Sequence, residues 1–322
     1  MKPTSVVVAA PNALKGVLSA RAAADALAGG FERAGVPCER VPVADGGEGT
    51  AEAFRSGLGG EWLDADASDA LGRPIVARFL RTPDGPVVLE AAEAIGLWRL
   101  ASEERDPLRA TSRGFGELVL AAVEAGAPEL VAGVGGVATV DGGAGLREVV
   151  RSLPVPTTVA CDVSNPLLGE HGAARVFGPQ KGASPADVEE LERRLETMEV
   201  LAPYAHVPGA GAAGGLGAAL AALGARLVPG AELVLEAIRF RDRIRKAALV
   251  VTGEGEVDRT TAGGKAPGAV ARVCADEGVR CVLFGGRVVE PLAGVETCAL
   301  SGDPARAERD LGALGEELAG TL

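Results

Sequence analysis

Short apolar runs alternate with helical stretches at both ends of the chain, and a loop rich in glycine or proline follows most of the runs. The expected strands are residues 5–10, 38–43, 248–251, 281–284 and 297–300. The expected helices are residues 18–33, 50–55, 267–276 and 304–318. This order is typical of βαβ units with parallel strands. We therefore predict that the two ends of the chain share one parallel sheet, with its ligand edge at the carboxyl ends of the strands.

The middle of the chain has a different pattern. Three short runs, around 62–65, 75–80 and 87–89, are separated by turn sequences and favour antiparallel hairpins. Helices are expected at 112–125, 185–198 and 231–240, the second with Ser184 as N-cap and Asp187 completing a capping box. We predict two domains: a discontinuous one of residues 1–60 and 240–322, and an inserted α/β domain of residues 61–239. The active site is expected in the cleft between them.

Charge and composition limit the function classes. The 322 residues carry a net charge of −12, which argues against nucleic acid or an anionic membrane as the partner. The five cysteines form no Cys-x-x-Cys pair, which favours reduced thiols in the cytoplasm, and two histidines cannot build a three-histidine zinc site. No apolar run is long enough for a signal peptide or a membrane span. We expect a cytoplasmic protein that acts on small molecules.

Six segments are richer in glycine, acidic residues and lysine than turns alone require. They are residues 10–16, 44–50, 133–145, 161–167, 177–183 and 252–265. Glycine lets backbone N–H groups approach phosphate oxygens, and phosphoryl transfer also needs acids for Mg²⁺, a cation for developing charge and an acid near the attacking hydroxyl. Only five of the 32 basic residues are lysines, and Lys15, Lys181 and Lys265 lie in these segments.

Each segment also has a purely structural interpretation, which the sequence leaves open. The Asp-Gly-Gly sequences at 45–47 and 141–143 are compatible with simple turns, and 133–145 with a tight strand-to-helix turn. Asp162 could cap a turn before Pro166. Lys15, Lys181 and Lys265 could be solvated surface charges.

Two further patterns carry less weight. Gly209, Gly211 and Gly214 match the dinucleotide pattern Gly-x-Gly-x-x-Gly, but the preceding segment is a poor strand, so close helix packing is the favoured explanation. An NAD-dependent hydroxy-acid dehydrogenase is therefore the weakest candidate function. No P-loop sequence occurs, and His171 and His206 are expected to be structural or surface residues.

Taken together and in order, the glycine-rich segments resemble the bacterial type I glycerate kinase family. The residues that carry the likeness are 43–50, Asp-Gly-Gly-Ala-Gly within 135–145, 161–169, 177–183, 209–217 and the Gly-Glu-Gly to Gly-Lys segment of 253–265. The resemblance implies a two-domain α/β protein with a Rossmann-like (flavodoxin-like) half. It implies ATP- and Mg²⁺-dependent phosphorylation of D-glycerate, commonly at the 2-hydroxyl, and it leaves a homodimer open.

The resemblance also suggests roles for individual residues. Asp45 or Asp162 would orient or deprotonate the glycerate hydroxyl, and Lys15 or Lys181 would balance the charge of the transferred phosphoryl group. Glu254 and Asp258 would hold Mg²⁺ or nucleotide, and Arg73 or Arg113 could clamp the glycerate carboxylate. The remaining expected substrate and nucleotide contacts are Gly46, Gly47, Gly135, Gly136, Thr139, Asp141, Asn165, Gly253, Gly255 and Lys265.

Several positions depart from the family pattern. The family usually has Asp-Ser-Phe-Lys-Gly where this chain has Asn12 to Gly16, and polar residues where Val137 and Val140 stand. A basic residue and a glutamine are usual where Glu256 and Thr260 stand. These departures motivate an alternative, a non-catalytic relative that binds glycerate or a nucleotide.

Overall fold

The computed structural model describes residues 6–322, which form two compact units. Ser5, the first residue of the predicted N-terminal strand, lies outside the described residues. Of the described residues, unit 1 contains 6–45, Glu52–Leu58 and Ala231–Leu322, and unit 2 contains Gly46–Ala51 and Gly59–Gly230. Both units are built on sheets with helices packed against them, which confirms the predicted α/β class.

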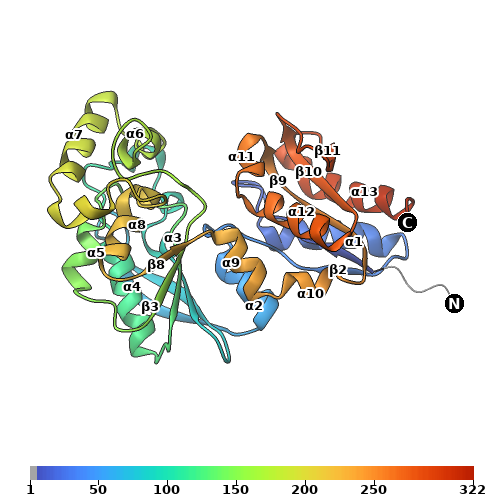
Figure 1. Cartoon of the computed structure of the whole chain (residues 1–322), viewed down its shortest axis with the longest axis horizontal. Helices are drawn as coiled ribbons and strands as arrows, with labels where there is room; N and C mark the ends of the chain where they lie inside the picture. Colours follow the sequence, from blue (N-terminus) through green and yellow to red (C-terminus); the bar gives the residue numbers. More distant parts are fainter. Residues whose placement is uncertain (1–5) are drawn as a thin grey trace. The chain divides into compact units, whose positions relative to one another are not determined.

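The sheet of unit 1 has five parallel strands in the order β11-β10-β9-β1-β2. Their bounds are β1 (Val6–Ala9), β2 (Cys38–Arg40), β9 (Ala247–Val257), β10 (Cys281–Val288) and β11 (Glu296–Ala299). In Figure 1 the blue strands from the start of the chain lie beside the orange and red strands from its end. The two ends of the chain therefore share one parallel sheet, as predicted.

Helices cover both faces of this sheet. The helices of unit 1 are α1 (Ala20–Arg33), α2 (Thr50–Leu58, with its first two residues in unit 2), α9 (Gly230–Ala237, with Gly230 in unit 2), α10 (Phe240–Ile244), α11 (Arg259–Ala262), α12 (Ala266–Glu277) and α13 (Ala307–Ala319), with a 3-10 turn at Pro304–Arg306. Helices α1 and α13 pack together over Val7, Leu249 and Val251, while α12 packs against β9 and β10. Successive residues of a strand point to opposite faces, and the alternate residue Val250 is also fully buried.

The sheet of unit 2 has six strands in the order β3-β4-β5-β6-β7-β8. Their bounds are β3 (Glu61–Ser68), β4 (Pro74–Arg81), β5 (Val87–Glu90), β6 (Leu130–Gly133), β7 (Thr157–Ala160) and β8 (Arg226–Val228). Strands β3, β4 and β5 pair antiparallel, which confirms the predicted hairpins. Strands β5 to β8 are parallel. Ligands bind at the carboxyl ends of parallel strands, so unit 2 has such an edge of its own.

The helices of unit 2 are α3 (Ala91–Ile95), α4 (Arg113–Glu124), α5 (Ala144–Val149), α6 (Ala173–Phe177), α7 (Pro185–Glu196) and α8 (Ala212–Ala222). Short 3-10 helices occupy Leu97–Arg99, Ser102–Glu104, Pro179–Lys181 and Glu199–Tyr204. The capping box of α7 is confirmed: the Ser184 hydroxyl accepts from the Asp187 N–H, and the Asp187 carboxylate accepts from the Ser184 N–H at 2.9 Å. Residues of β3 to β7 and of α3, α4, α5 and α8 form the main core.

One element corrects the sequence-based prediction directly. We expected a glycine-rich loop after residue 251, but β9 continues to Val257 because β10 pairs with it as far as Val288. Gly253 permits this pairing, since a Cβ atom there would lie 2.2 Å from the Phe284 carbonyl oxygen. Gly253, Glu254 and Gly255 are therefore strand residues. The close approach of two strands explains the glycine at 253 better than a phosphate-binding turn does.

A second correction concerns the helix expected at 231–240. The chain forms two helices there, α9 and α10, separated by Arg239 with φ +54°. A left-handed backbone is rare for a residue other than glycine and ends a helix.

The limits of the two units differ from the predicted division at 60/61 and 239/240. Residues 46–51 group with unit 2, where the Gly135 N–H donates to the Gly46 carbonyl oxygen at 3.2 Å. Residues 231–239 group with unit 1, where Ile238 contacts Gly57 so closely that a Cβ atom on the glycine would lie 2.6 Å away.

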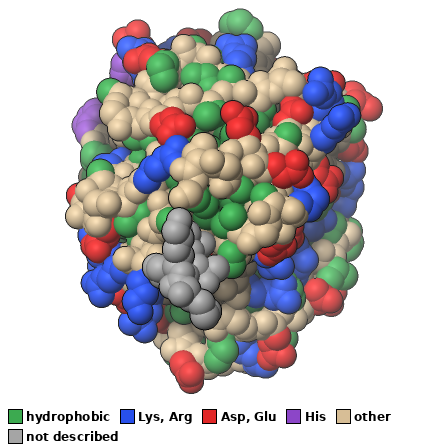
Figure 2. Space-filling model, turned by 90° about the vertical axis from the view of Figure 1, so that its right-hand side faces the viewer, with side chains coloured by type: hydrophobic (Ala, Val, Ile, Leu, Met, Phe, Trp, Pro, Cys, Tyr) green, Lys and Arg blue, Asp and Glu red, His purple; other side chains and the backbone are tan. Residues whose placement is uncertain are grey.

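The surface carries mixed charge. Figure 2 shows Lys and Arg side chains interspersed with Asp and Glu side chains on the face it presents. Many of these groups form ion pairs, such as Arg280 with Glu296 at 2.9 Å. Across residues 6–322, every helix is too short or too polar to cross a bilayer.

Candidate functional site

In unit 1, three predicted site residues, together with Asn12 from the segment that departs from the family pattern, follow or lie on three adjacent parallel strands. Asn12 and Lys15 follow β1, and Asp45 follows β2. Glu254 lies in β9, the strand between β1 and β10 in the sheet. The Asn12 N–H donates to the Gly253 carbonyl oxygen at 2.9 Å, and the Asn12 side-chain amide donates to Oδ2 of Asp45 at 3.0 Å. Asn12 is only 4 % exposed, so the donor side of this hydrogen bond is buried. Asp45 is partly exposed and Lys15 is exposed.

Glu254 is held by a hydroxyl and an ammonium group. The Thr261 hydroxyl donates to Oε1 of Glu254 at 2.7 Å, and Nζ of Lys265 lies 3.4 Å from Oε2. The same Nζ lies 3.7 Å from Oδ1 of Asp258. Lys265 therefore links the two carboxylates that the resemblance assigns to Mg²⁺ or nucleotide.

Burial and hydrogen bonding act on these two carboxylates in opposite directions. Burial raises the pKa of Glu254, although Thr261 and Lys265 oppose the shift and Asp45 adds to it. The pKa of Asp258 is lowered, chiefly because its carboxylate accepts a hydrogen bond from the Thr260 hydroxyl at 2.5 Å. Asp258 also caps α11 through the Thr260 N–H. Asp258 is thus the better stabilised anion of the pair.

The carboxylates of Glu254 and Asp258 fit a magnesium ion only if substrate phosphates supply further ligands. The residues described, 6–322, contain no group of three or more His, Cys, Asp or Glu side chains arranged to hold a metal. Mg²⁺ is commonly bound through one or two carboxylates together with substrate phosphates. Glu254 and Asp258 supply two such carboxylates, and the residues present therefore fit an ion that arrives with a nucleotide.

In unit 2, the segment 46–51 is tied to the segment after β6. Besides the Gly46–Gly135 hydrogen bond, Gly46 packs against β7: a Cβ atom there would lie 2.5 Å from the Ala160 carbonyl oxygen. A Cβ atom at Gly135 would lie 2.7 Å from Cα of Gly47. Predicted contacts Gly46, Gly47 and Gly135 therefore lie together. Gly136 follows with a positive φ of 75° and is exposed.

Lys181 is not the solvated surface charge that its purely structural interpretation allowed. Its side chain is buried, with the residue 4 % exposed, and Nζ donates to the Thr139 carbonyl oxygen at 2.7 Å. Burial lowers the pKa of Lys181 to about 7, and the nearby Asp141 charge partly opposes this shift. In this conformation Lys181 supports the 133–145 segment from within unit 2.

Asp141 forms the turn that its Asp-Gly-Gly sequence indicated, and it also reaches a distant segment. Its carboxylate accepts from the Gly143 N–H and the Gly145 N–H, both at 3.1 Å. It also accepts from the N–H and the hydroxyl of Ser112, both at 2.8 Å. Gly142 and Gly143 have positive φ values of 59° and 68°. Four donors therefore fix Asp141 as an organiser of the start of α5.

Asp162 and Asn165 lie in the loop after β7. Oδ1 of Asp162 accepts from the Gly230 N–H at 2.9 Å. The Asn165 amide donates to the His171 carbonyl oxygen at 2.9 Å, and both residues are partly exposed. Both histidines are exposed, as expected.

The comparisons with known proteins agree with each other. The model of the glycerate kinase family matches residues 7–152 and 149–302. The chain is 41 % identical to glycerate 2-kinase of Escherichia coli K12 over 309 residues, covering 83 % of this chain and 81 % of the relative. It is 37 % identical to a glycerate kinase of Halalkalibacterium halodurans over 325 residues, with 88 % and 85 % covered. The chain belongs to the glycerate kinase family. The expected family and the expected kinase class are thereby confirmed.

A solved structure from the same family extends this likeness to the fold. A Salmonella typhimurium LT2 protein described as glycerate kinase 2 superposes with a TM-score of 0.83 at 32 % identity. The superposition covers 99 % of this chain and 98 % of that one.

The residues that depart from the usual glycerate kinase pattern have defined structural places. Val137 and Val140 are 2 % and 1 % exposed, and each belongs to a hydrophobic cluster. Glu256 pairs with Arg287 at 3.3 Å on the surface, and Thr260 donates to Asp258. Both valines are thus core residues.

Other sequence features find structural explanations. Arg73, a candidate to bind the glycerate carboxylate, forms ion pairs with Asp69 and Glu104, both at 2.6 Å. Arg113 likewise pairs with Glu117 at 2.9 Å.

The Gly-x-Gly-x-x-Gly pattern serves close packing rather than a dinucleotide. A Cβ atom at Gly211 would lie 2.1 Å from the Pro166 carbonyl oxygen, and one at Gly214 would lie 2.1 Å from the Thr139 carbonyl oxygen. The loop before α8 is therefore pressed against the 139 and 166 segments.

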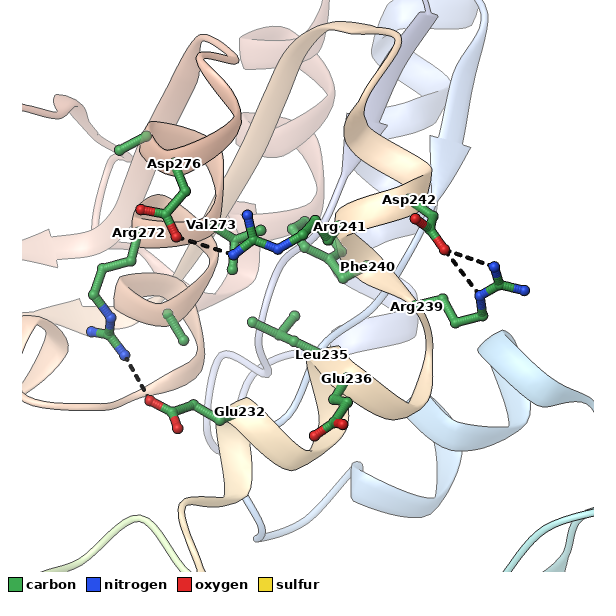
Figure 3. A pocket seen from close by; sticks show the side chains of 12 residues that line it. Glu232, Leu235, Glu236, Arg239, Phe240, Arg241, Asp242, Arg272, Val273 and Asp276 are labelled. Carbon is green, nitrogen blue, oxygen red and sulfur yellow. Dashed lines mark hydrogen bonds and ion pairs between the residues drawn. The ribbon is translucent and has the colours of Figure 1, made fainter.

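A hollow of about 620 Å³ lies in unit 1 among α9, α10 and α12, and its lining includes none of the predicted site residues (Figure 3). Its charged side chains largely pair with one another: Arg241 with Asp276 at 3.0 Å, and Arg239 with Asp242 at 2.8 Å. In unit 1 the predicted site residues lie after β1 and β2, within β9 and around α11 instead.

Sequence reasoning missed two residues of these clusters. Thr261 was not singled out, although its hydroxyl joins Glu254 to the start of α11. Glu90, at the end of β5, accepts from the Ala51 N–H at 2.7 Å and from the Gly49 N–H at 3.3 Å. A lone acid that ends an apolar run, Val-Val-Leu-Glu, was the signal for Glu90.

Proposed function

We propose that this protein transfers the γ-phosphoryl group of ATP to the 2-hydroxyl of D-glycerate and so forms 2-phosphoglycerate and ADP. Family membership across residues 7–302 supports the reaction class. The name of the Escherichia coli relative, glycerate 2-kinase, supports the 2-hydroxyl. The observation that carries the proposal is the group formed by Asn12 and Asp45, which follow β1 and β2, and by Glu254 of β9 with Lys265, in a chain of this family.

In this mechanism a carboxylate takes the proton of the attacking hydroxyl. A bond forms between the glycerate oxygen and the γ-phosphorus, and the bond from that phosphorus to the β–γ bridging oxygen breaks, releasing ADP. Asp45 or Asp162 is the acceptor of the proton. Asp45 is partly exposed and is oriented by the Asn12 amide, which suits a group that must meet a substrate.

A lysine balances charge on the transferred group. Lys15 is the better of the two candidates because it is exposed, whereas the ammonium group of Lys181 is buried against the Thr139 carbonyl. Lys181 then acts through the segment that it supports. Backbone N–H groups of Gly136, Gly46 and Gly47 are candidates to receive an anion.

Glu254 and Asp258 would hold Mg²⁺ together with the nucleotide. The ion would supply charge neutralisation on the β- and γ-phosphate oxygens. Lys265 contacts both carboxylates. When the nucleotide binds, the Lys265 ammonium group would leave one of them and contact a phosphate instead. We further expect a cytoplasmic protein, and a homodimer stays a prediction.

An ADP-release assay coupled to NADH oxidation tests the proposal. Saturating ATP and Mg²⁺ with D-glycerate should give ADP at a rate that depends on glycerate concentration. The phosphorus NMR spectrum of the product then distinguishes 2-phosphoglycerate from 3-phosphoglycerate. If calorimetry detects glycerate binding but the assay detects no ADP release, the non-catalytic alternative is favoured and the kinase proposal is refuted.

A further inference from the structure

Glu90 is a buried carboxylate that the proposed mechanism does not use. It is the last residue of β5, where its backbone lies beside Gly133 of β6. The residue is 7 % exposed. It precedes α3 but does not cap that helix with its side chain. Its hydrogen bonds go to another segment of unit 2 instead.

Both carboxylate oxygens of Glu90 accept backbone N–H groups near the start of α2. Oε1 accepts from Ala51 at 2.7 Å, and Oε2 accepts from Gly49 at 3.3 Å. Gly49 ends the Gly46–Gly49 loop and Ala51 lies two residues beyond it; the loop has positive φ values at Gly46 and Gly49. The loop also closes on itself through the Thr50 hydroxyl, which donates to the Gly47 carbonyl oxygen at 2.7 Å.

The loop is therefore held at its two ends. At one end the Gly46 carbonyl oxygen accepts from Gly135, and at the other end Glu90 takes two N–H groups. A loop with two left-handed glycines has many alternative conformations when its anchors are lost.

We propose that Glu90 is a positioning residue for the phosphoryl transfer, which holds the Gly46–Gly49 loop in the conformation that receives substrate. This inference rests on the proposed function, because it assigns Gly46 and Gly47 to substrate or nucleotide binding. Glu90 itself touches no substrate in this scheme.

The protonation of Glu90 provides a specific readout. Burial raises the pKa of Glu90 to about 7, opposed by the Ala51 and Gly49 hydrogen bonds and reinforced by Glu93 and Glu48. Glu48 comes from the loop itself and Glu93 from α3, where Glu93 is paired with Arg78 at 3.1 Å and lies 3.9 Å from Arg99. The ionised carboxylate accepts both N–H groups more strongly than the neutral acid does. Glu90→Gln therefore mimics the state of the wild-type loop at low pH.

The experiment measures kcat and KM of the full-length wild type and of Glu90→Gln between pH 6 and 8.5. We expect the wild-type to variant ratio of kcat/KM to rise at least fivefold across this range. Glu192→Gln is the matched control, since Glu192 is 5 % exposed in the same unit and accepts the Gly169 N–H at 2.6 Å. Its ratio to wild type should not change with pH. A ratio for Glu90→Gln that is equally flat would overturn the proposal.

Amide hydrogen exchange provides the independent measurement. Exchange at Gly49 and Ala51 should be at least tenfold faster in Glu90→Gln than in wild type at pH 8, with little change at Gly169. Unchanged exchange at both amides would also overturn the anchoring. Should Glu90→Gln fail to fold, Glu90→Asp keeps the charge on a shorter side chain. Its kcat/KM should be lower than that of the wild type and should still rise with pH, and a kcat/KM equal to that of the wild type counts against the proposal. A wild type without glycerate-dependent turnover would refute the proposed function instead, while exchange would still report on the anchor.

Discussion

The Asn12 side-chain amide donates a 3.0 Å hydrogen bond to Oδ2 of Asp45, and it does so from a position that is almost completely buried. The two residues follow neighbouring parallel strands and are separated by 33 positions in the chain. An amide in this place orients the carboxylate without adding a second negative charge beside it. Asp45 therefore presents one defined oxygen, Oδ2, to the Asn12 amide.

Asp45→Asn should lower kcat by about 100-fold or more if Asp45 takes the hydroxyl proton. The fold should survive, because an asparagine at 45 keeps an oxygen that can accept from the Asn12 amide. Steady-state kinetics and the thermal midpoint, measured on the same sample, check both parts. A variant with wild-type kcat would assign the proton to another group.

Asp162→Asn tests the competing carboxylate. It retains the oxygen that accepts the Gly230 N–H, so folding should again be preserved. If Asp162 is the base, kcat should drop by about 100-fold or more, whereas a change confined to KM would indicate a binding role. Comparing the two variants decides between Asp45 and Asp162.

Lys181→Met should change the pH dependence of stability. The pKa of Lys181 is lowered from 10.5 to about 7 in the folded protein, so between these pH values the unfolded chain binds more protons. The free energy of unfolding of the wild type should therefore gain up to about 1.4 kcal/mol per pH unit from this group as pH rises above 7. Urea denaturation at pH 6.5, 8 and 9.5 measures the slope, which methionine should remove. An identical slope in both proteins would show that the buried lysine stays charged.

Glu254→Gln should lower the apparent affinity of the enzyme for Mg²⁺. Glutamine keeps an oxygen for the Thr261 hydroxyl but loses the negative charge near Lys265. We expect the Mg²⁺ concentration for half-maximal rate to rise about tenfold or more, because a neutral amide is a poorer ligand for a hard cation. Glu256→Gln is the control, since that carboxylate lies two residues away on the same strand and pairs with Arg287 at the surface. Equal effects of the two variants would remove Glu254 from the metal assignment.

Gly253→Ala should destabilise unit 1 by about 1–3 kcal/mol, because its methyl group would meet the Phe284 carbonyl oxygen at 2.2 Å. Gly255→Ala, two residues further on the same strand, has its nearest neighbour at 3.6 Å and should be tolerated. Denaturant midpoints of the two variants provide the comparison. Equal stability would show that the strand pair β9 and β10 can separate locally at no cost.

Much of the architecture was predictable from local patterns. The alternation of runs and helices at the chain ends, the turn sequences between β3, β4 and β5, and the Ser184 capping box depend on neighbours within a few residues, and the structure confirms them. The glycine-rich segments also indicated the correct family, because their order along the chain is itself a linear property.

Long-range contacts decided the rest. Strand β9 runs through Gly253 to Val257 because β10 lies beside it, although the sequence there resembles a loop. Lys181 is buried against Thr139, 42 residues away, and Glu90 anchors Ala51 across 39 residues. Burial, hydrogen-bond partners and pKa values arise only when such distant segments meet, because a side chain's environment is set by what packs around it. Local sequence thus specified the alternating elements at the chain ends and the antiparallel hairpins, while tertiary packing decided which acids and lysines became buried anchors.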